Sequence, residues 1–203
     1  MPDPRRGALM LLAFMVVGCG VRESMPTFRS AAPLSVAPSS FSLSQLPPRQ
    51  SYAHHHPIRL AYNSVANQTR VSLTTHKGMY FLWIQRPRVT FFYDFAGTIP
   101  TGVPATVSLA FRTTNPQFPA TNALSTICDG VASSQPITPT FWSQAGPVVT
   151  SDNYTYEIPL LTFTDLLKCD ALTIEVGGIR APLKPEQMNA LRDFASRMAS
   201  GGS

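Results

Sequence analysis

The chain has 203 residues and a mass of 22.1 kDa, enough for one ordinary domain with a tail and too little for two full domains. Charged residues make up 13% of it, against a usual share of about 25%, and it contains 19 Pro and 12 Gly. This composition excludes a coiled coil, a charged disordered tail and a helix-rich bundle. The net charge of +5 is not gathered in a basic stripe, so we expect no nucleic-acid partner.

The first eighteen residues have the pattern of a secretory signal peptide. Arg5 and Arg6 precede an apolar run from Gly7 to Val17, and Gly18 then stands before Cys19. This run is too short for a transmembrane helix, which needs about 20 residues to cross a hydrocarbon core of about 30 Å. We therefore expect export. If cleavage occurs elsewhere, Cys19 is only an apolar residue of the signal.

The residues Val16-Val17-Gly18-Cys19 resemble the lipobox of bacterial lipoproteins. The resemblance implies cleavage before Cys19, diacylglycerol on the Cys19 thiol, and further acylation by a fatty acid such as palmitate. Several acyl chains would anchor the chain in a membrane. Gly20 is not the Asp that retains such proteins in the inner membrane. The resemblance thus implies the bacterial cell envelope, and in a Gram-negative cell the outer membrane, facing the periplasm or the cell surface.

Residues 19–56 are rich in Pro and Ser and have no periodic apolar stripe, which is typical of a flexible linker. The folded domain is then expected to span residues 57–203. Three adjacent histidines, His54 to His56, lie at the end of the linker. In a flexible segment they would bind a metal only weakly, so we expect no metal and no other cofactor.

Cys128 and Cys169 remain once Cys19 is set aside. An even pair in an exported chain predicts a disulfide, and two buried free thiols are the alternative. Closing a loop of 41 residues (169 − 128) would contribute about 4 kcal/mol to the free energy of unfolding.

From Pro57 onward, apolar residues alternate with polar ones, the pattern of half-buried antiparallel strands. Gly177-Gly178 suits a tight hairpin turn. Pro87 is expected to interrupt a strand, residues 129–147 to be irregular, and Thr164–Lys168 to form one helical turn capped by Thr164. The strands are predicted near residues 58–62, 71–74, 79–84, 89–95, 106–112, 124–128, 154–158, 172–176 and 179–183.

The chain ends in a predicted helix that begins at Pro185. Its apolar positions recur with helical spacing from Met188 to Met198, and Glu186 lies at the end where the helix dipole favours an acid. We therefore predict a mainly β fold, an antiparallel β-sandwich of about eight or nine strands with one C-terminal amphipathic α-helix.

Residues 58–198 loosely resemble a family of uncharacterised exported bacterial proteins and lipoproteins. Four segments carry the resemblance: Asn67-Gln-Thr-Arg-Val, Leu161-Thr-Phe-Thr-Asp-Leu-Leu, Leu172-Thr-Ile-Glu-Val-Gly-Gly and Glu186-Gln-Met-Asn-Ala-Leu-Arg-Asp-Phe. The resemblance implies a small mixed-β domain without an assigned activity, so no functional residue follows from it.

The sequence lacks the common nucleophile, metalloprotease, phosphate-loop and dinucleotide motifs, so we identify no catalytic residue. Phe141 and Trp142 are the best candidates for a binding surface. Adjacent residues of an extended chain point to opposite sides, and an exposed ring can stack on a sugar or a protein.

We therefore expect a lipid-anchored envelope protein that acts as a non-catalytic binding or assembly module, with an envelope protein or a glycan as its partner. One alternative is an envelope hydrolase or metal-dependent enzyme using the carboxylates of Asp94, Asp129 or Asp152. Another is a purely structural envelope component with an exposed edge strand.

Overall fold

The computed structural model describes residues 46–48, 52–81, 84–99, 102–114, 123–145 and 150–198. For residues 78–81 and 84–86 the structure describes the backbone alone. The predicted signal peptide, Cys19 and Trp83 lie outside the described residues.

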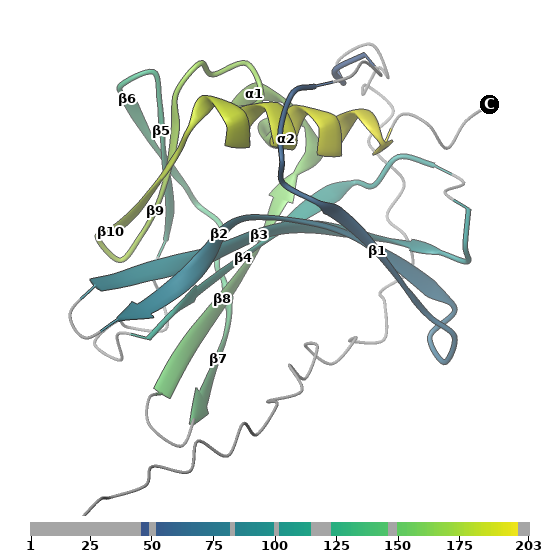
Figure 1. Cartoon of the computed structure of the whole chain (residues 1–203), viewed down its shortest axis with the longest axis horizontal. Helices are drawn as coiled ribbons and strands as arrows, with labels where there is room; N and C mark the ends of the chain where they lie inside the picture. The colour runs from purple at the N-terminus through teal and green to yellow at the C-terminus, as the bar shows by residue number, and fades with distance from the viewer. Residues whose placement is uncertain are drawn as a thin grey trace, which may run out of the picture.

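The described residues form ten strands and two helices (Figure 1). The first five strands are β1 (Ile58–Asn63), β2 (Gln68–Phe81), β3 (Ile84–Ala96), β4 (Thr106–Thr113) and β5 (Leu124–Cys128). The other five are β6 (Val131–Gln135), β7 (Thr140–Ala145), β8 (Thr150–Pro159), β9 (Leu172–Val176) and β10 (Ile179–Leu183). The helices are α1 (Leu160–Leu166) and α2 (Pro185–Ser196).

The strands form two antiparallel sheets. The larger has the order β1-β2-β3-β4-β8-β7, and the smaller has the order β10-β9-β5-β6. Figure 1 shows α2 lying over one face of the larger sheet, with the smaller sheet standing at one end. The predicted mainly β sandwich with a C-terminal helix is confirmed.

The larger sheet is apolar on one face, which we call the inner face, and mixed polar on the other, the outer face. Phe163 of α1 and Phe194 of α2 cover the inner face, with ring centroids 6.1 Å from Phe91 and 5.3 Å from Tyr93 respectively. Burying such rings supplies most of the driving force for folding. The buried residues of this face include Val71, Leu73, Val89, Phe91, Tyr93, Phe95, Val107, Leu109, Phe111, Tyr154, Tyr156 and Ile158.

The prediction of an irregular segment over residues 129–147 is wrong, because β6 and β7 lie there and bring the described strands to ten. All β6 side chains except that of Gln135 are exposed. A strand with so few buried side chains does not require alternating apolar and polar residues. The two-residue period that identifies a strand is therefore missing from this part of the sequence.

Pro87 does not interrupt a strand either, because β3 continues through it. β3 pairs with β4 only from Arg88 onward, so Pro87 lies outside the part of β3 that has both β2 and β4 as neighbours. A strand tolerates Pro at such a position because its missing N–H is not required by a second neighbour.

The C-terminal helix begins as predicted, with Pro185 in its first turn and Glu186 after it. Gln187 accepts a hydrogen bond from the backbone N–H of Lys184 (2.7 Å), which caps the N-terminus. The prediction of a helical turn at Thr164–Lys168 is wrong in its position, because α1 begins at Leu160. Thr164 is buried within it, and its hydroxyl donates to the Leu161 carbonyl instead of capping the helix.

The β9–β10 hairpin confirms the turn predicted at Gly177-Gly178. Both glycines have positive φ, +57° and +82°, which glycine adopts without steric cost.

Candidate interaction surface

Phe141 and Trp142 both lie on β7, at the edge of the larger sheet opposite β1. Phe141 faces inward and packs on Tyr154, with 5.0 Å between the ring centroids. Trp142 faces outward and is 40% exposed. The predicted division of the pair between the two faces is therefore observed, and Trp142 is the ring that a partner can reach.

Trp142 begins a row of residues that crosses the outer face. Each strand contributes one residue opposite the next, and the order is Trp142, Asn153, Arg112, Arg88 and Lys77. Strands lie about 4.8 Å apart, so the row extends about 19 Å. Its last three residues are cations, which we call the basic row, and none of the five residues is acidic.

Arg112 is the best defined member of the basic row. Its Nη2 donates to the hydroxyl of Ser151 on β8 (3.1 Å), so the guanidinium is directed toward the β7 edge. Its Nε is buried and has no hydrogen-bond partner among the described residues. Sequence reasoning missed this row because its members are separated by up to 65 positions (142 − 77) and converge only through the sheet register.

The three carboxylates of the alternative enzyme proposal are each held in a structural contact. Asp94 accepts two hydrogen bonds from Arg70, both 2.8 Å long. Asp152 is buried and accepts a hydrogen bond from Ser143 (2.7 Å). Asp129 accepts bonds from the backbone N–H groups of residues 170 and 171, at 3.0 and 2.8 Å.

Asp94 and Asp152 also lie on opposite faces of the larger sheet. Phe92 and Glu157 share a row through Ser108. β3 and β8 run in the same direction, because each is antiparallel to β4. Asp94 lies two residues after this row on β3 and Asp152 lies five residues before it on β8, so the two are offset by seven residues along the strand direction. At about 3.3 Å per residue the separation is about 23 Å, which is too large for two carboxylates to act on one bond.

A disulfide joins Cys128, at the end of β5, to Cys169, which precedes β9. The two Cα atoms are 5.4 Å apart. The predicted pair is confirmed, and it leaves neither sulfur as a thiol. Asp129 adjoins both sulfurs, but disulfide sulfur has lost the thiolate charge by which cysteine binds metals. This cluster therefore stabilises the fold.

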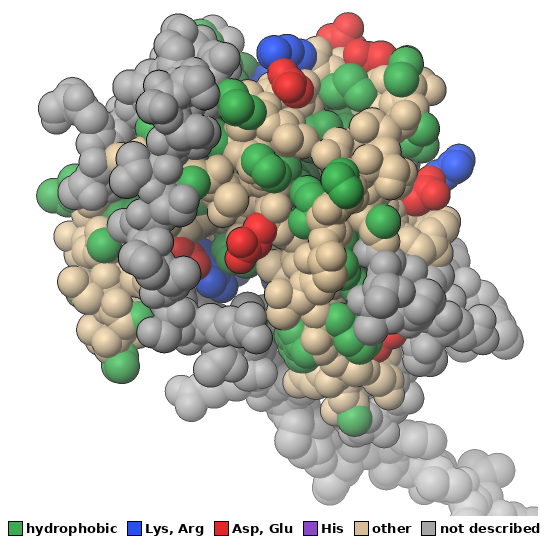
Figure 2. All heavy atoms as spheres, turned by 180° about the vertical axis from the view of Figure 1, so that it is seen from behind, with side chains coloured by type: hydrophobic (Ala, Val, Ile, Leu, Met, Phe, Trp, Pro, Cys, Tyr) green, Lys and Arg blue, Asp and Glu red, His purple; other side chains and the backbone are tan. Residues whose placement is uncertain are grey.

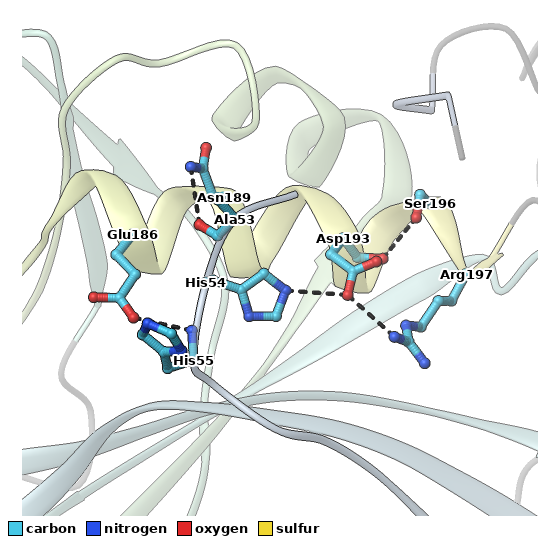
Figure 3. Close-up of polar contacts among 8 residues, drawn as sticks. All are labelled: Ala53, His54, His55, Glu186, Asn189, Asp193, Ser196 and Arg197. Carbon is cyan, nitrogen blue, oxygen red and sulfur yellow. Dashed lines mark hydrogen bonds and ion pairs between the residues drawn. The ribbon is translucent and has the colours of Figure 1, made fainter. Parts of the chain in front are cut away.

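The three adjacent histidines lie in a segment that contacts the folded domain. Residues Tyr52–Pro57, which we call the strap, cross α2 before entering β1 (Figure 3). Asn189 donates to the carbonyl of Ala53 (3.4 Å), and Glu186 accepts from the backbone N–H of His55 (3.0 Å). Residues 52–56, which were expected to belong to the flexible linker, thus contact the folded domain.

The histidine side chains do not converge on one point. His54 Nε2 lies 3.1 Å from a carboxylate oxygen of Asp193, which also receives a bond from Arg197 (3.1 Å). His56 Nδ1 instead donates to the carbonyl of Thr74 on β2 (3.3 Å). The imidazoles therefore serve to attach the strap to two different elements.

Four of the seven exposed large apolar side chains among the described residues lie at one corner of the larger sheet. Leu60 and Tyr62 on β1 are 62% and 50% exposed, Val65 in the following turn is 96% exposed, and Ile99 after β3 is 74% exposed. The Asn67 carbonyl accepts a bond from Gly97, which joins the β1–β2 turn to the end of β3. We call these four residues the apolar corner. Sequence reasoning assigned Leu60 and Tyr62 to a strand but did not foresee their exposure.

Burial shifts the pKa of two core tyrosines, Tyr93 and Tyr156. Burial raises the pKa of Tyr93 to about 12, and the nearby Arg197 partly opposes the shift. Burial also raises the pKa of Tyr156, and Tyr154 adds to that shift. Both hydroxyls lie in the core, so these shifts concern stability.

Figure 2 shows that charged side chains are few over the described part of the face seen from behind, and that several blue and red groups lie next to each other. No helix among the described residues is long and apolar enough to cross a membrane. No protein-family model, curated protein or solved structure matches the chain.

Proposed function

We propose that the protein is a lipid-anchored component of a bacterial cell envelope, and that it is a non-catalytic binding module. Cys19 would carry the acyl chains, and the residues between it and Leu46, which is buried in the core, would tether the domain to the membrane. A coil of 26 residues, from Gly20 to Gln45, has a root-mean-square span of about 28 Å. The domain would therefore work close to the membrane surface.

The proposed binding surface is Trp142 together with the basic row. The supporting observation is that the exposed ring lies on the same sheet face as three cations, with no acidic residue in the row between them. A ring can stack on a sugar or a side chain, and arginines bind carboxylate or phosphate groups through paired N–H donors. This chemistry favours a glycan or envelope protein that carries negative charge.

The anchor can be tested without reference to binding. Cells that express the full chain would be fed a labelled fatty acid, and the wild type would be compared with Cys19→Ser. We expect label on the wild type and none on the variant, which should keep its uncut signal. An unlabelled wild type with an intact N-terminus would refute the anchor.

The binding surface can be tested by capture from solubilised envelopes and on an array of acidic and neutral glycans. Trp142→Ala should reduce capture at least tenfold, whereas Gln144→Ala, an exposed substitution on the same face of the same strand, should leave it unchanged. Capture should also weaken as salt rises, because exposed charges are screened. Equal capture by wild type and Trp142→Ala would refute the proposed surface.

A further inference from the structure

One edge of the larger sheet carries the chemistry of a self-association surface. β1 pairs with β2 over six consecutive residues, and the sheet order places no described strand on its other side. In an antiparallel pair, alternate residues direct their N–H and C=O groups away from the partner strand. Three residues of β1 therefore present both a donor and an acceptor along this edge, which can pair with an added strand.

The side chains of β1 add an apolar contact to these backbone groups. Leu60 and Tyr62 face the same side of the sheet as the buried Val71 and Leu73. Even so, at least half of each side chain is exposed. The cause is that α2 packs over β2 and β10, so its cover does not extend fully over the edge strand. Two strands joined at this edge would bring these side chains into contact and remove them from water.

The other edges are less suited to this role. β10 contains Pro182 and the charged Arg180, both of which discourage strand addition, and β6 exposes mainly small polar side chains. β7 carries Trp142, which the proposed function assigns to a ligand. β1 has no Pro, an unbroken register with β2, and Arg59 as its single charge.

We propose that β1 pairs with β1 of a second copy of this chain, so that two six-stranded sheets join into one. A two-fold axis makes the strands antiparallel, and paired residues must face the same side. With Leu60 opposite its own copy, Tyr62 lies opposite Ile58, and Arg59 lies opposite Ala61. This register places apolar residues together and sets each cation against a neutral residue.

Self-pairing is also favoured by charge. A register centred on Arg59 would oppose two cations and is disfavoured, whereas the registers centred on Leu60 or Ala61 avoid that contact. β1 can therefore pair with its own copy without an acidic partner, because its single cation, Arg59, then lies opposite a neutral residue. The inference is independent of the anchor and of Trp142, because no residue is shared with either.

The test uses the full chain with a single added cysteine. Leu60→Cys should form a disulfide-linked dimer under mild oxidation in membranes, seen on non-reducing gels and absent after reduction. Glu157→Cys, an exposed position on the outer face of β8, is the matched control and should remain monomeric. Equal cross-linking of the two variants would overturn the proposal.

Sedimentation of the detergent-solubilised chain gives the second measurement. Leu60→Lys should weaken the dimer at least tenfold, because it places two cations opposite each other, whereas Ile99→Lys, in the same apolar corner but two strands from the edge, should spare it. A wild type that stays monomeric up to about 100 µM would overturn the proposal, because specific interfaces have dissociation constants below that concentration.

A lipid surface is the other occupant that the apolar corner could meet, and the same variants separate it. A solvent-sensitive fluorophore on Leu60→Cys and on Ile99→Cys would report insertion at both positions in vesicles of phosphatidylethanolamine and phosphatidylglycerol. Insertion of both positions with a monomeric chain would assign the corner to the bilayer and overturn the dimer. Shielding of the fluorophore from water at position 60 but not at position 99, in a dimeric chain, supports the proposed dimer.

Discussion

The imidazole Nε2 of His54 lies 3.1 Å from Oδ2 of Asp193, so a residue that precedes β1 is bound to the last turns of the C-terminal helix. An ionised carboxylate can only accept hydrogen bonds, so Nε2 carries the proton. Figure 3 shows this contact near the middle of the strap, with the Asn189 and Glu186 contacts on one side.

Removing this contact should loosen the strap. We expect His54→Ala to lower the free energy of unfolding by about 1 kcal/mol, below the roughly 1.5–3 kcal/mol that is typical of a hydrogen bond to a charged group, because Asp193 keeps Arg197 as a partner. His54→Gln, which retains a donor, should lose less. Urea unfolding measures both values. His55→Ala is the control, because its contact is made by the backbone.

The disulfide should account for a large part of the stability. Replacing Cys128 and Cys169 together by Ser should lower the free energy of unfolding by about 4 kcal/mol, through the entropy that the 41-residue loop regains in the unfolded chain. Unfolding in urea with and without reductant tests this. The wild type should shift on reduction and the double variant should not. A wild type that is insensitive to reductant throughout its unfolding would contradict the expectation.

Asp129 should behave as a structural residue with a specific backbone requirement. Its φ is +49°, a region that Asn tolerates and Ala does not, and its carboxylate accepts two backbone hydrogen bonds. We expect Asp129→Ala to cost about 2–3 kcal/mol and Asp129→Asn less than about 1 kcal/mol. Thermal or denaturant unfolding would show the difference. Equal losses would mean that the positive φ contributes nothing.

Tyr93 should make the protein less stable in alkali. Its pKa is about 10 when exposed and about 12 in the fold, so between these values the unfolded chain releases a proton that the folded chain retains. Its contribution is complete below pH 10 and is lost as pH rises toward 12, by at most about 1.4 kcal/mol per pH unit.

The check is a comparison of unfolding free energies for wild type and Tyr93→Phe between pH 9 and pH 11.5. The variant should have a shallower decline, because Phe does not titrate. Parallel pH profiles for the two proteins would show that the hydroxyl is not desolvated in the fold.

Much of the fold could be predicted because burial imposes a period on the sequence. Apolar residues recur at every second position in the strands around Phe91, Leu109, Tyr156 and Ile174, and the glycine pair at 177 and 178 marks its own turn. β6 and β7 escaped prediction because their side chains are largely exposed, so solvent rather than packing selects their residues.

The strap and the candidate surface depend on contacts that a local pattern cannot contain. His54 and Asp193 are 139 positions apart, and the order of Lys77, Arg88 and Arg112 across the sheet follows from strand pairing alone. What local reasoning could supply was the opposite orientation of Phe141 and Trp142, because that follows from the geometry of any extended chain.

The strap also determines where a mechanical load would enter the domain. Tension that passes the buried Leu46 next reaches Ala53, His54 and His55, and their bonds to α2 resist it before the end of β1 is pulled. Without these bonds, the same pull would peel β1 from β2 one residue pair at a time. These three polar contacts thus act as a clamp, and they shield the edge strand β1 from stress transmitted along the backbone.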